Sequence, residues 1–290
     1  MTADPVGNGQ ILAIHRKGQA SADHQTNDRL LLDGVLSGLE ASGYEIRAIE
    51  EDAIVDVLAE GRPDRVVSMA QLPKNTAHLA QLAPDGIPVI NSFASVLATY
   101  RSFLAAAMAK RPDIPFAATS IFTAIDAASF DGAEATAFEN LHTRFRGAFW
   151  VKRGDVHATG ERDVQLIESS PAFVEAVASM RERGIETMIA QQHYPGPVLK
   201  FYAISERRFF HLQELTTGTV MNDPSGRIEQ IATDLADFLG LTIFGGDVVM
   251  LPDGPVVIDV NAWPSFSSVR DIAAPLIAEA IAEEFAAGGA

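Results

Sequence analysis

The sequence has 290 residues, of which 47% are hydrophobic and 21% charged, so we expect a globular protein of two or three packed subdomains. It carries 22 Lys and Arg residues against 38 Asp and Glu residues, a formal charge of −16, which disfavours nucleic acid and membranes as partners. The absence of Cys excludes disulfides, thiolate metal sites and Cys nucleophiles. We recognise no signal peptide and no long apolar span, so a cytoplasmic protein is expected.

Short apolar runs alternate with helical patterns over the first ninety residues. This alternation predicts a parallel sheet with helical crossovers. Because no G-x-G-x-x-G motif follows the first strand, a dinucleotide-binding domain is disfavoured. The expected strands are 10–16, 44–50, 64–70 and 87–91, the expected helices are 27–43, 53–61 and about 78–82, and a continuous Ala-rich helix is expected over 92–110.

The second half of the chain has a different pattern. Residues 111–122 lead into a strand, and residues 147–169 indicate a strand, a glycine-containing loop and another strand. Consecutive strands with short links then predict an antiparallel sheet, so this half is expected to be α+β. The remaining expected elements are a helix at 171–184, strands at 186–194, 198–205 and 208–215, a helix at 226–239, a hairpin at 245–262 and a helix at 269–285.

The hairpin carries three oxygen-bearing side chains among apolar neighbours. Asp259 and Asn261 are two residues apart on one strand and therefore point to the same face. Asp247 lies on the preceding strand, across a Pro-Asp-Gly turn. Hard oxygen ligands without His or Cys suit Mg²⁺ or Mn²⁺. The alternative is that these residues only end a strand and form a turn.

Two lysines interrupt apolar strands. Lys152 in "AFWVKRG" and Lys200 in "VLKFYAIS" are each suited to contact a nucleotide phosphate. Val198 and Tyr202 share the strand face of Lys200, while Leu199 and Phe201 take the other face. The alternative is a lysine that extends along apolar surface to water.

Two polar segments accompany these lysines. The loop "RGDVHATGERD" after Lys152 has two glycines and could cover phosphates, although it matches no P-loop pattern and could equally be a surface loop. The stretch Gln191, Gln192, His193 and Tyr194 precedes Pro-Gly-Pro, and it predicts either a hinge that binds an adenine edge or a polar loop.

In this order, these features resemble the ATP-grasp superfamily over residues 10–285. "VKRGD" resembles the strand lysine that contacts phosphates, "IAQQHYPG" is similar to the hinge between the lobes, and "GGDVVM…VVIDVNAWPS" resembles the magnesium-binding hairpin. The resemblance implies ATP and Mg²⁺ (or Mn²⁺) as cofactors. It implies Asp247, Asp259 and Asn261 as metal ligands, and as nucleotide contacts Arg101, Lys152, Gln191, Gln192, His193, Tyr194 and Lys200.

The resemblance also implies an architecture of three parts. Residues 1–92 are expected to form an N-terminal parallel α/β domain, residues 93–190 a central lobe, and residues 191–290 a C-terminal lobe with the metal-binding hairpin. The two lobes would clamp the nucleotide.

Two branches of the superfamily compete for the reaction. Asp259 in place of Glu, "AWPSF" after it, Arg101 and Lys200 resemble the inositol trisphosphate kinase branch. The basic substrate motifs of those kinases are missing, however, because "HATGERD" and "LQEL" stand in their places. A carboxylate–amine ligase acting on a small molecule through an acyl phosphate is therefore favoured, with a kinase that phosphorylates a hydroxyl as the alternative.

The acceptor is expected between the N-terminal domain and the hairpin. The nearest cations there are His15, Arg16, Lys17 and Arg270, and Lys152, Lys200 and Arg270 are the candidate catalytic residues. His157 and His193 are expected to be loop histidines rather than catalytic bases. A protein that senses ATP without turnover is the alternative to an enzyme, and the sequence leaves the oligomeric state open, with a homodimer as one option.

Overall fold

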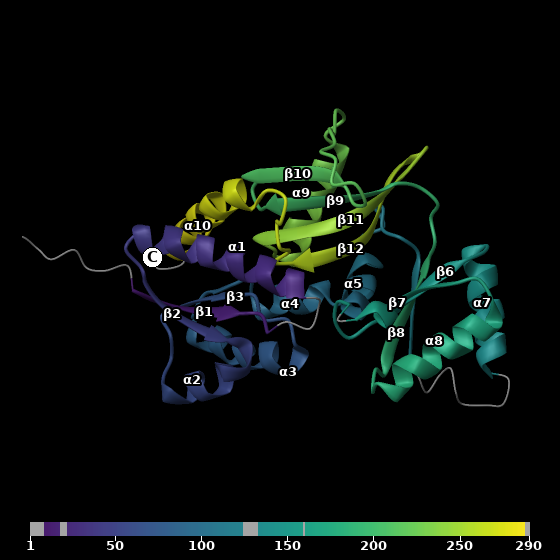
Figure 1. Ribbon diagram of the computed structural model, residues 1–290, viewed down its shortest axis with the longest axis horizontal. Coiled ribbons are helices and arrows are strands. Elements are labelled where there is room, and N and C mark those ends of the chain that lie inside the picture. Colours follow the sequence, from purple (N-terminus) through teal and green to yellow (C-terminus); the bar gives the residue numbers. More distant parts are fainter. Residues whose placement is uncertain (1–8, 18–21, 124–132, 159, 288–290) are drawn as a thin grey trace, which may run out of the picture.

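The computed structural model describes residues 9–17, 22–123, 133–158 and 160–287. The described residues form three four-stranded sheets, which we call sheets A, B and C (Figure 1). No helix in these described ranges combines the length and the apolarity needed to cross a membrane. The predicted combination of a parallel α/β unit with antiparallel α+β units is confirmed.

Sheet A is the parallel unit formed by the first ninety residues, in the strand order β2-β1-β3-β4. The expected alternation of strands and helices is confirmed. The stretch around residues 78–82, however, is a 3₁₀ helix. In chain order the elements are β1 (Gln10–His15), α1 (Ala22–Ala41), β2 (Glu45–Glu50), the 3₁₀ turn η1 (Glu51–Ala53), α2 (Ile54–Glu60), β3 (Arg65–Ser68), α3 (Pro73–Thr76), the 3₁₀ helix η2 (Ala77–Asp85) and β4 (Val89–Ile90).

The last helix, α10 (Arg270–Ala287), returns to this unit and packs beside α1 (Figure 1). Small residues face one another along the contact: a Cβ added at Gly34 would lie 3.2 Å from Ala274 Cβ, and one added at Gly38 would lie 2.7 Å from Ala278 Cβ. Glycine therefore lets the two helices approach closely, and both ends of the chain contribute to one hydrophobic core.

Sheet C is antiparallel, in the order β5-β8-β6-β7. Helices α7 and α8 cover one face through buried aromatic residues such as Phe138, Phe149 and Phe173. Helix α7 is not among the elements expected from the sequence, although Phe138, Leu141 and Phe145 have helical spacing. The elements are β5 (Thr119–Thr123), α7 (Ala133–Phe145), β6 (Phe149–Arg153), β7 (Val164–Ile167), α8 (Ser170–Glu182) and β8 (Thr187–Gln192).

Sheet B is also antiparallel, in the order β10-β9-β11-β12. One of its faces is apolar: Leu199, Phe201 and Val248 lie in a core with residues of α9, α4 and α5. The elements are α4 (Phe93–Thr99), α5 (Arg101–Met108), β9 (Val198–Ile204), β10 (Phe209–Glu214), α9 (Arg227–Leu239), β11 (Ile243–Leu251) and β12 (Gly254–Ala262).

The strand expected at 186–194 does not pair with the strand that follows it. Strand β8 pairs instead with β5 and β6 of sheet C, and β9 begins sheet B. The Pro195-Gly196-Pro197 link explains the separation, because proline lacks the N–H that a sheet ladder needs. At its centre, Gly196 lies so close to β11 that an added Cβ would sit 2.7 Å from Met250 O.

The helix expected as continuous over 92–110 is broken at Tyr100. Tyr100 has an extended backbone (φ −64°, ψ 134°), so α4 ends before it and α5 begins after it. The buried Tyr100 hydroxyl donates to Gln71 O at 2.8 Å and lies 3.1 Å from Thr76 Oγ1. These tertiary contacts outweigh the helix propensity of the Ala-rich segment, and the break directs Arg101 toward sheet B.

The close approach of α1 and α10 yields a test of the fold. Gly38→Leu should lower the free energy of unfolding by about 1–3 kcal/mol, because the new side chain must displace α10. Urea denaturation measures the change. Ser37→Leu, on the exposed side of the same helix, is the matched control and should have little effect. Equal effects of the two variants would contradict the packing described here.

Candidate active site

A row of polar side chains crosses sheet B on the face opposite its apolar core. Cross-strand pairing joins Gln213 to Lys200, Lys200 to Asp247, and Asp247 to Asp259. Directly paired residues project on the same side of a sheet, with Cβ atoms about 5 Å apart. Lys200 Nζ lies 2.9 Å from Asp247 Oδ1. The structure thus brings together the predicted cation and both predicted metal-binding carboxylates.

Asn261 lies one step further along the same face. It follows Asp259 by two residues on β12 and pairs with Gly245 on β11. A Cβ added at Gly245 would lie 2.6 Å from Phe201 O and 3.0 Å from Pro264 Cγ, so only glycine fits at this position. The strand alternation predicted for Asp259 and Asn261 is therefore present, and the segment after the hairpin folds back over it.

Asp259 is held by a buried ion pair with Arg101. Arg101 Nη2 lies 3.0 Å from Asp259 Oδ2, and both residues are buried. Burial by itself would raise the pKa of Asp259, but the positive charge of Arg101, together with His157 and Lys152, lowers that pKa to about 2. Asp259 is therefore a carboxylate at neutral pH. Arg101 Nε and Nη1 are buried and have no hydrogen-bond partner among the described residues.

Lys152 approaches the Arg101–Asp259 pair from sheet C. Its Nζ donates to Gln191 Oε1 at 2.7 Å, and Gln191 Nε2 donates in turn to Thr119 Oγ1 at 3.3 Å. Burial lowers the pKa of Lys152 to about 8, against the attraction of Asp259. Burial also acts to lower the pKa of Lys200, but Asp247 more than offsets it and raises that pKa. An added anion near Lys152 would favour its charged form.

His157 is a site residue that the sequence analysis did not use. It lies in the β6–β7 loop, with Nε2 3.2 Å from Thr99 Oγ1 and Nδ1 3.9 Å from Asp259 Oδ1. Burial lowers its pKa to about 4, so the imidazole is neutral at pH 7. A single histidine in a polar loop has no sequence signal that would have indicated this burial.

The hinge segment connects sheets C and B. Tyr194 OH donates to Gln192 Oε1 at 3.0 Å, and Trp150 Nε1 donates to His193 Nδ1 at 3.1 Å. The backbone N–H of Gln192 donates to Ala118 O at 2.9 Å. Three of the four predicted hinge residues, Gln192, His193 and Tyr194, are thus held by local contacts, and Trp150 is an aromatic neighbour that the sequence analysis did not identify.

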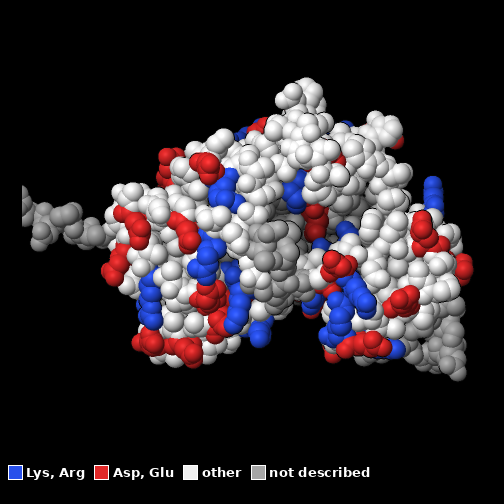
Figure 2. All heavy atoms as spheres, in the orientation of Figure 1, with Lys and Arg blue, Asp and Glu red and all other residues white. Residues whose placement is uncertain are grey.

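The face of sheet C that carries Lys152 also has accessible apolar side chains. Pairing places Ile121 beside Ile189 and Ile189 beside Lys152, and it places Leu166 beside Trp150. Ile121 is 46% exposed and Leu166 37% exposed. Figure 2 shows that the surface is hollowed beside this part of the molecule, with acidic and basic side chains inside the hollow. An apolar surface with a few polar groups is typical of a small-molecule site.

A cavity of about 370 Å³ opens on the other side of the polar row. One wall is formed by the ends of the strands of sheet A, with Arg16, Lys17, Glu51 and Gln71. The facing wall is formed by sheet B, the segment after β12 and the tip of the β6–β7 loop. Its lining includes Val156, His157, Ala158, Lys200, Tyr202, Gln213, Asn261 and Trp263. Lys200 and Asn261 therefore contribute to the cavity as well as to the polar row.

Arg16 joins the two walls of this cavity. Its Nη1 donates to Asp28 Oδ2 at 2.9 Å, its Nε to Met69 O at 3.1 Å, and its Nη2 to Trp263 O at 3.1 Å. The guanidinium is thus occupied by protein groups from α1, the end of β3 and the segment after β12. Arg16 lies where the sequence predicted an acceptor-binding cation, but its contacts are those of a structural tie.

The other cations expected near the acceptor differ in position. Lys17 lines the cavity and pairs with the exposed Asp52. His15 is not among the lining residues and lies 3.5 Å from Asp33. Arg270 is also outside the lining, and its Nη2 donates to Asn27 Oδ1 at 2.6 Å. Of these four cations, Arg16 and Lys17 reach the cavity.

The donor set of the hairpin suits a hard cation. No group of three or more His, Asp or Glu side chains that could hold a metal occurs in the described part of the chain. A site here would use the two carboxylates of Asp247 and Asp259 and the amide oxygen of Asn261. Mg²⁺ commonly takes one or two protein carboxylates and fills its other positions with water and phosphate, so this set fits Mg²⁺.

Comparison with known proteins identifies the fold. No family model and no curated protein matches the chain. A D-alanine–D-alanine ligase from Coxiella burnetii aligns with a TM-score of 0.73 at 15% identity, over 97% of this chain and 96% of the ligase. A D-alanine–D-alanine ligase from Bacillus anthracis, complexed with ATP, gives 0.70 at 12% identity over 96% and 97% of the two chains.

A third solved structure is the RimK domain ATP-grasp protein from Sphaerobacter thermophilus. It has a TM-score of 0.67 at 19% identity and covers 94% of this chain and 98% of that protein. The chain has the ATP-grasp fold. The resemblance stated from the sequence is confirmed at the level of the fold.

The contacts of Arg16 yield a second test. Arg16→Gln should lower the free energy of unfolding by about 3 kcal/mol, because it leaves the partly buried Asp28 without its counter-charge and two carbonyl groups without donors. Lys17→Gln, which removes an exposed charge of the same cavity, should leave the stability unchanged. Thermal unfolding of both variants checks this, and an unaffected Arg16→Gln variant would refute the structural tie.

Proposed function

We propose that this protein is an ATP-dependent enzyme that uses Mg-ATP to activate a small-molecule acceptor. The observation that carries the proposal is the row of Lys200, Asp247 and Asp259 in direct cross-strand register, with Lys152 approaching from sheet C. A cation, two carboxylates and a second buried cation between two sheets are suited to bind a metal–triphosphate complex.

In this proposal the nucleotide binds between the polar face of sheet B and the Lys152 face of sheet C. The unpaired N–H groups of Arg101 support a phosphate contact there, because a buried donor without a partner is costly and a phosphate oxygen would satisfy it. Lys152 and Lys200 would contact phosphates as well. Gln191, Gln192, His193 and Tyr194, beside the apolar side chains of sheet C, would contact the base.

Asp247, Asp259 and Asn261 would hold Mg²⁺ or Mn²⁺, which supplies positive charge to the phosphates during transfer. In the protein alone, Lys200 and Arg101 pair with the two carboxylates. Each cation lies within reach of a carboxylate and of the proposed phosphate position, so it can move its hydrogen bonds from one to the other. In the free protein these cations neutralise the two carboxylates, and in the nucleotide complex the metal ion would take that role.

For the acceptor we propose a carboxylate, which would make the protein a carboxylate–amine ligase acting through an acyl phosphate. The fold is shared with proteins named as D-alanine–D-alanine ligases, and it is shared across almost the whole chain. The cavity of about 370 Å³ beside Lys200 and Asn261 would hold the acceptor. Such an enzyme would work in the cytoplasm on small metabolites.

A kinase that phosphorylates a hydroxyl is the second candidate. The Arg101–Asp259 pair favours it, since both residues resemble the inositol trisphosphate kinase branch. The cavity disfavours a polyphosphorylated acceptor, because the two cations on its sheet A wall already have acidic partners: Arg16 pairs with Asp28 and Lys17 with Asp52. Arg270 lies outside the cavity lining and donates to Asn27, so its position gives no support to the catalytic role predicted for it.

Titration calorimetry with ADP tests the nucleotide and metal site. The wild-type protein should bind ADP, and Mg²⁺ should strengthen that binding. Asp247→Asn should abolish the Mg²⁺ enhancement, because the amide is an uncharged ligand. Asp253→Asn, on the exposed turn of the same hairpin, should behave like the wild type. Absence of any Mg²⁺-dependent binding of ADP or ATP to the wild type would refute the proposal.

Hydroxylamine trapping tests the acceptor class. Incubation with ATP, Mg²⁺ and pooled small carboxylic acids should yield a hydroxamate, since hydroxylamine attacks an acyl phosphate in place of the amine. Phosphate release without hydroxylamine should require both an acid and an amine. A stable phosphate ester as the product, with no hydroxamate, would replace the ligase assignment by the kinase. Binding of ATP without any turnover would indicate a nucleotide sensor.

A further inference from the structure

The loop between β6 and β7 connects sheet C to the polar row of sheet B. Its described residues are 154–158 and 160–163, ending in the 3₁₀ turn Glu161–Asp163. At its tip, Val156 is buried in the apolar core of sheet B, and His157 approaches Asp259 to 3.9 Å. The position of this loop therefore determines what lies beside the proposed phosphate site.

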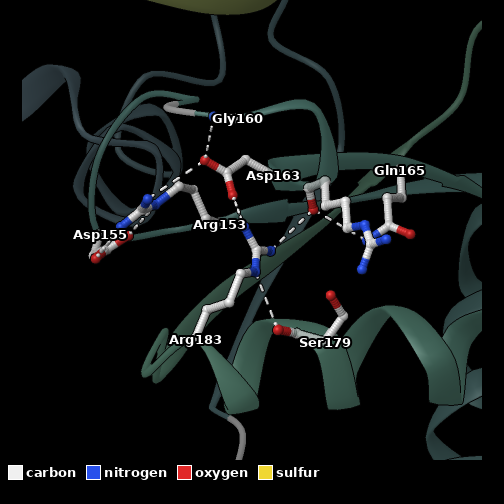
Figure 3. Close-up of polar contacts among 8 residues, drawn as sticks. Arg153, Asp155, Gly160, Asp163, Gln165, Ser179 and Arg183 are labelled. Carbon is white, nitrogen blue, oxygen red and sulfur yellow. Dashed lines mark hydrogen bonds and ion pairs between the residues drawn. The ribbon is translucent and has the colours of Figure 1, made fainter. Parts of the chain in front are cut away.

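One buried carboxylate holds both ends of the loop. Asp163 is completely buried, and its Oδ2 accepts from Gly160 N at 3.1 Å and lies 3.4 Å from Arg153 Nη1. Its Oδ1 accepts from Arg183 Nη1 at 2.5 Å. Arg153 precedes the loop, whereas Gly160 belongs to its final part, so Asp163 cross-links the start of the loop to its end (Figure 3).

Arg183 fastens this cross-link to α8. Besides Asp163, its guanidinium donates to Arg162 O at 3.2 Å through Nη2 and to Ser179 O at 3.1 Å through Nε. Figure 3 shows the side chain reaching from the end of the helix to the loop. Arg153 adds a two-point contact with Asp155, in which Nε and Nη2 each donate to a carboxylate oxygen at 2.8 Å.

The proposed catalytic groups do not include this network. A buried ion cluster is commonly no more stabilising than apolar packing of the same volume, so general stability is a weak reason for its presence. Its geometric effect is specific, however. It removes freedom from a loop that would otherwise have to be ordered when a ligand binds, and ordering a loop lowers affinity.

We propose that Asp163 and Arg183 are positioning residues that hold the β6–β7 loop ready for the phosphate groups of a bound nucleotide. The inference rests on the proposed nucleotide site. These side chains would touch neither the nucleotide nor the metal. Loosening the network should therefore lower the affinity for ligands that carry phosphates and leave the affinity for the nucleoside unchanged.

Calorimetry in Mg²⁺ with ATP, ADP and adenosine tests this with Arg183→Met. Arg183 is partly exposed, so the variant should fold, and thermal unfolding verifies this. We expect affinity for ATP and ADP to fall by about tenfold, with adenosine binding unchanged. Arg183→Lys, which keeps one donor for Asp163, should restore part of the loss. Arg181→Met removes the same charge from an exposed position in the same helical turn and should have no comparable effect.

Hydrogen exchange separates failure of this inference from failure of the proposed function. In the free protein, Arg183→Met should speed amide exchange in residues 154–158 and 160–163 and leave the core of sheet C unchanged. Unchanged exchange in the loop would overturn the inference even if wild-type protein bound no nucleotide. Equal losses for adenosine and ATP, no loss for any ligand, or an equal loss in Arg181→Met would overturn it as well.

Discussion

The buried ion pair between Arg101 and Asp259 is the interaction on which the site depends. It joins α5 to β12, and it keeps a carboxylate charged in a place where burial acts to raise its pKa. The break at Tyr100 directs Arg101 to this point, and the register of sheet B places Asp247 and Lys200 next to Asp259. Lys152 then approaches from another sheet, so three cations surround two carboxylates at the site.

The two sides of the polar row differ in physical character. Toward sheet C, accessible apolar side chains lie on the same face as Lys152. In the proposal, the apolar side chains would contact a flat aromatic base and the lysine its phosphates. Toward sheet A, the cavity is lined by polar and apolar side chains in similar measure, and its cations are already paired. Lys200 lies between these regions. A phosphoryl group transferred from one side to the other would pass beside it, which is why the row is the functional centre of the proposal.

Polar ties add to the shared hydrophobic core in holding the elements around this centre. Arg16 links sheet A to the segment after β12, and Asn91 links β4 to β11 through Thr242 N and the backbone groups of Ile243. Asp163 and Arg183 hold the β6–β7 loop in the same manner. Each tie uses polar side chains that bond to backbone groups of another segment, an arrangement that specifies one relative position of the connected elements.

The sequence by itself determined the strands, most of the helices and the faces of the strands, because these follow from local periodicity. The alternation in β9 placed Lys200 opposite Leu199 and Phe201, and the spacing of Asp259 and Asn261 placed both on one side of β12. Only the tertiary structure decided the break at Tyr100, the assignment of β8 to sheet C, the burial of His157 and the use of Arg16 as a tie. These depend on contacts between residues far apart in the chain, whose free energies exceed local preferences and leave no mark in a short stretch of sequence.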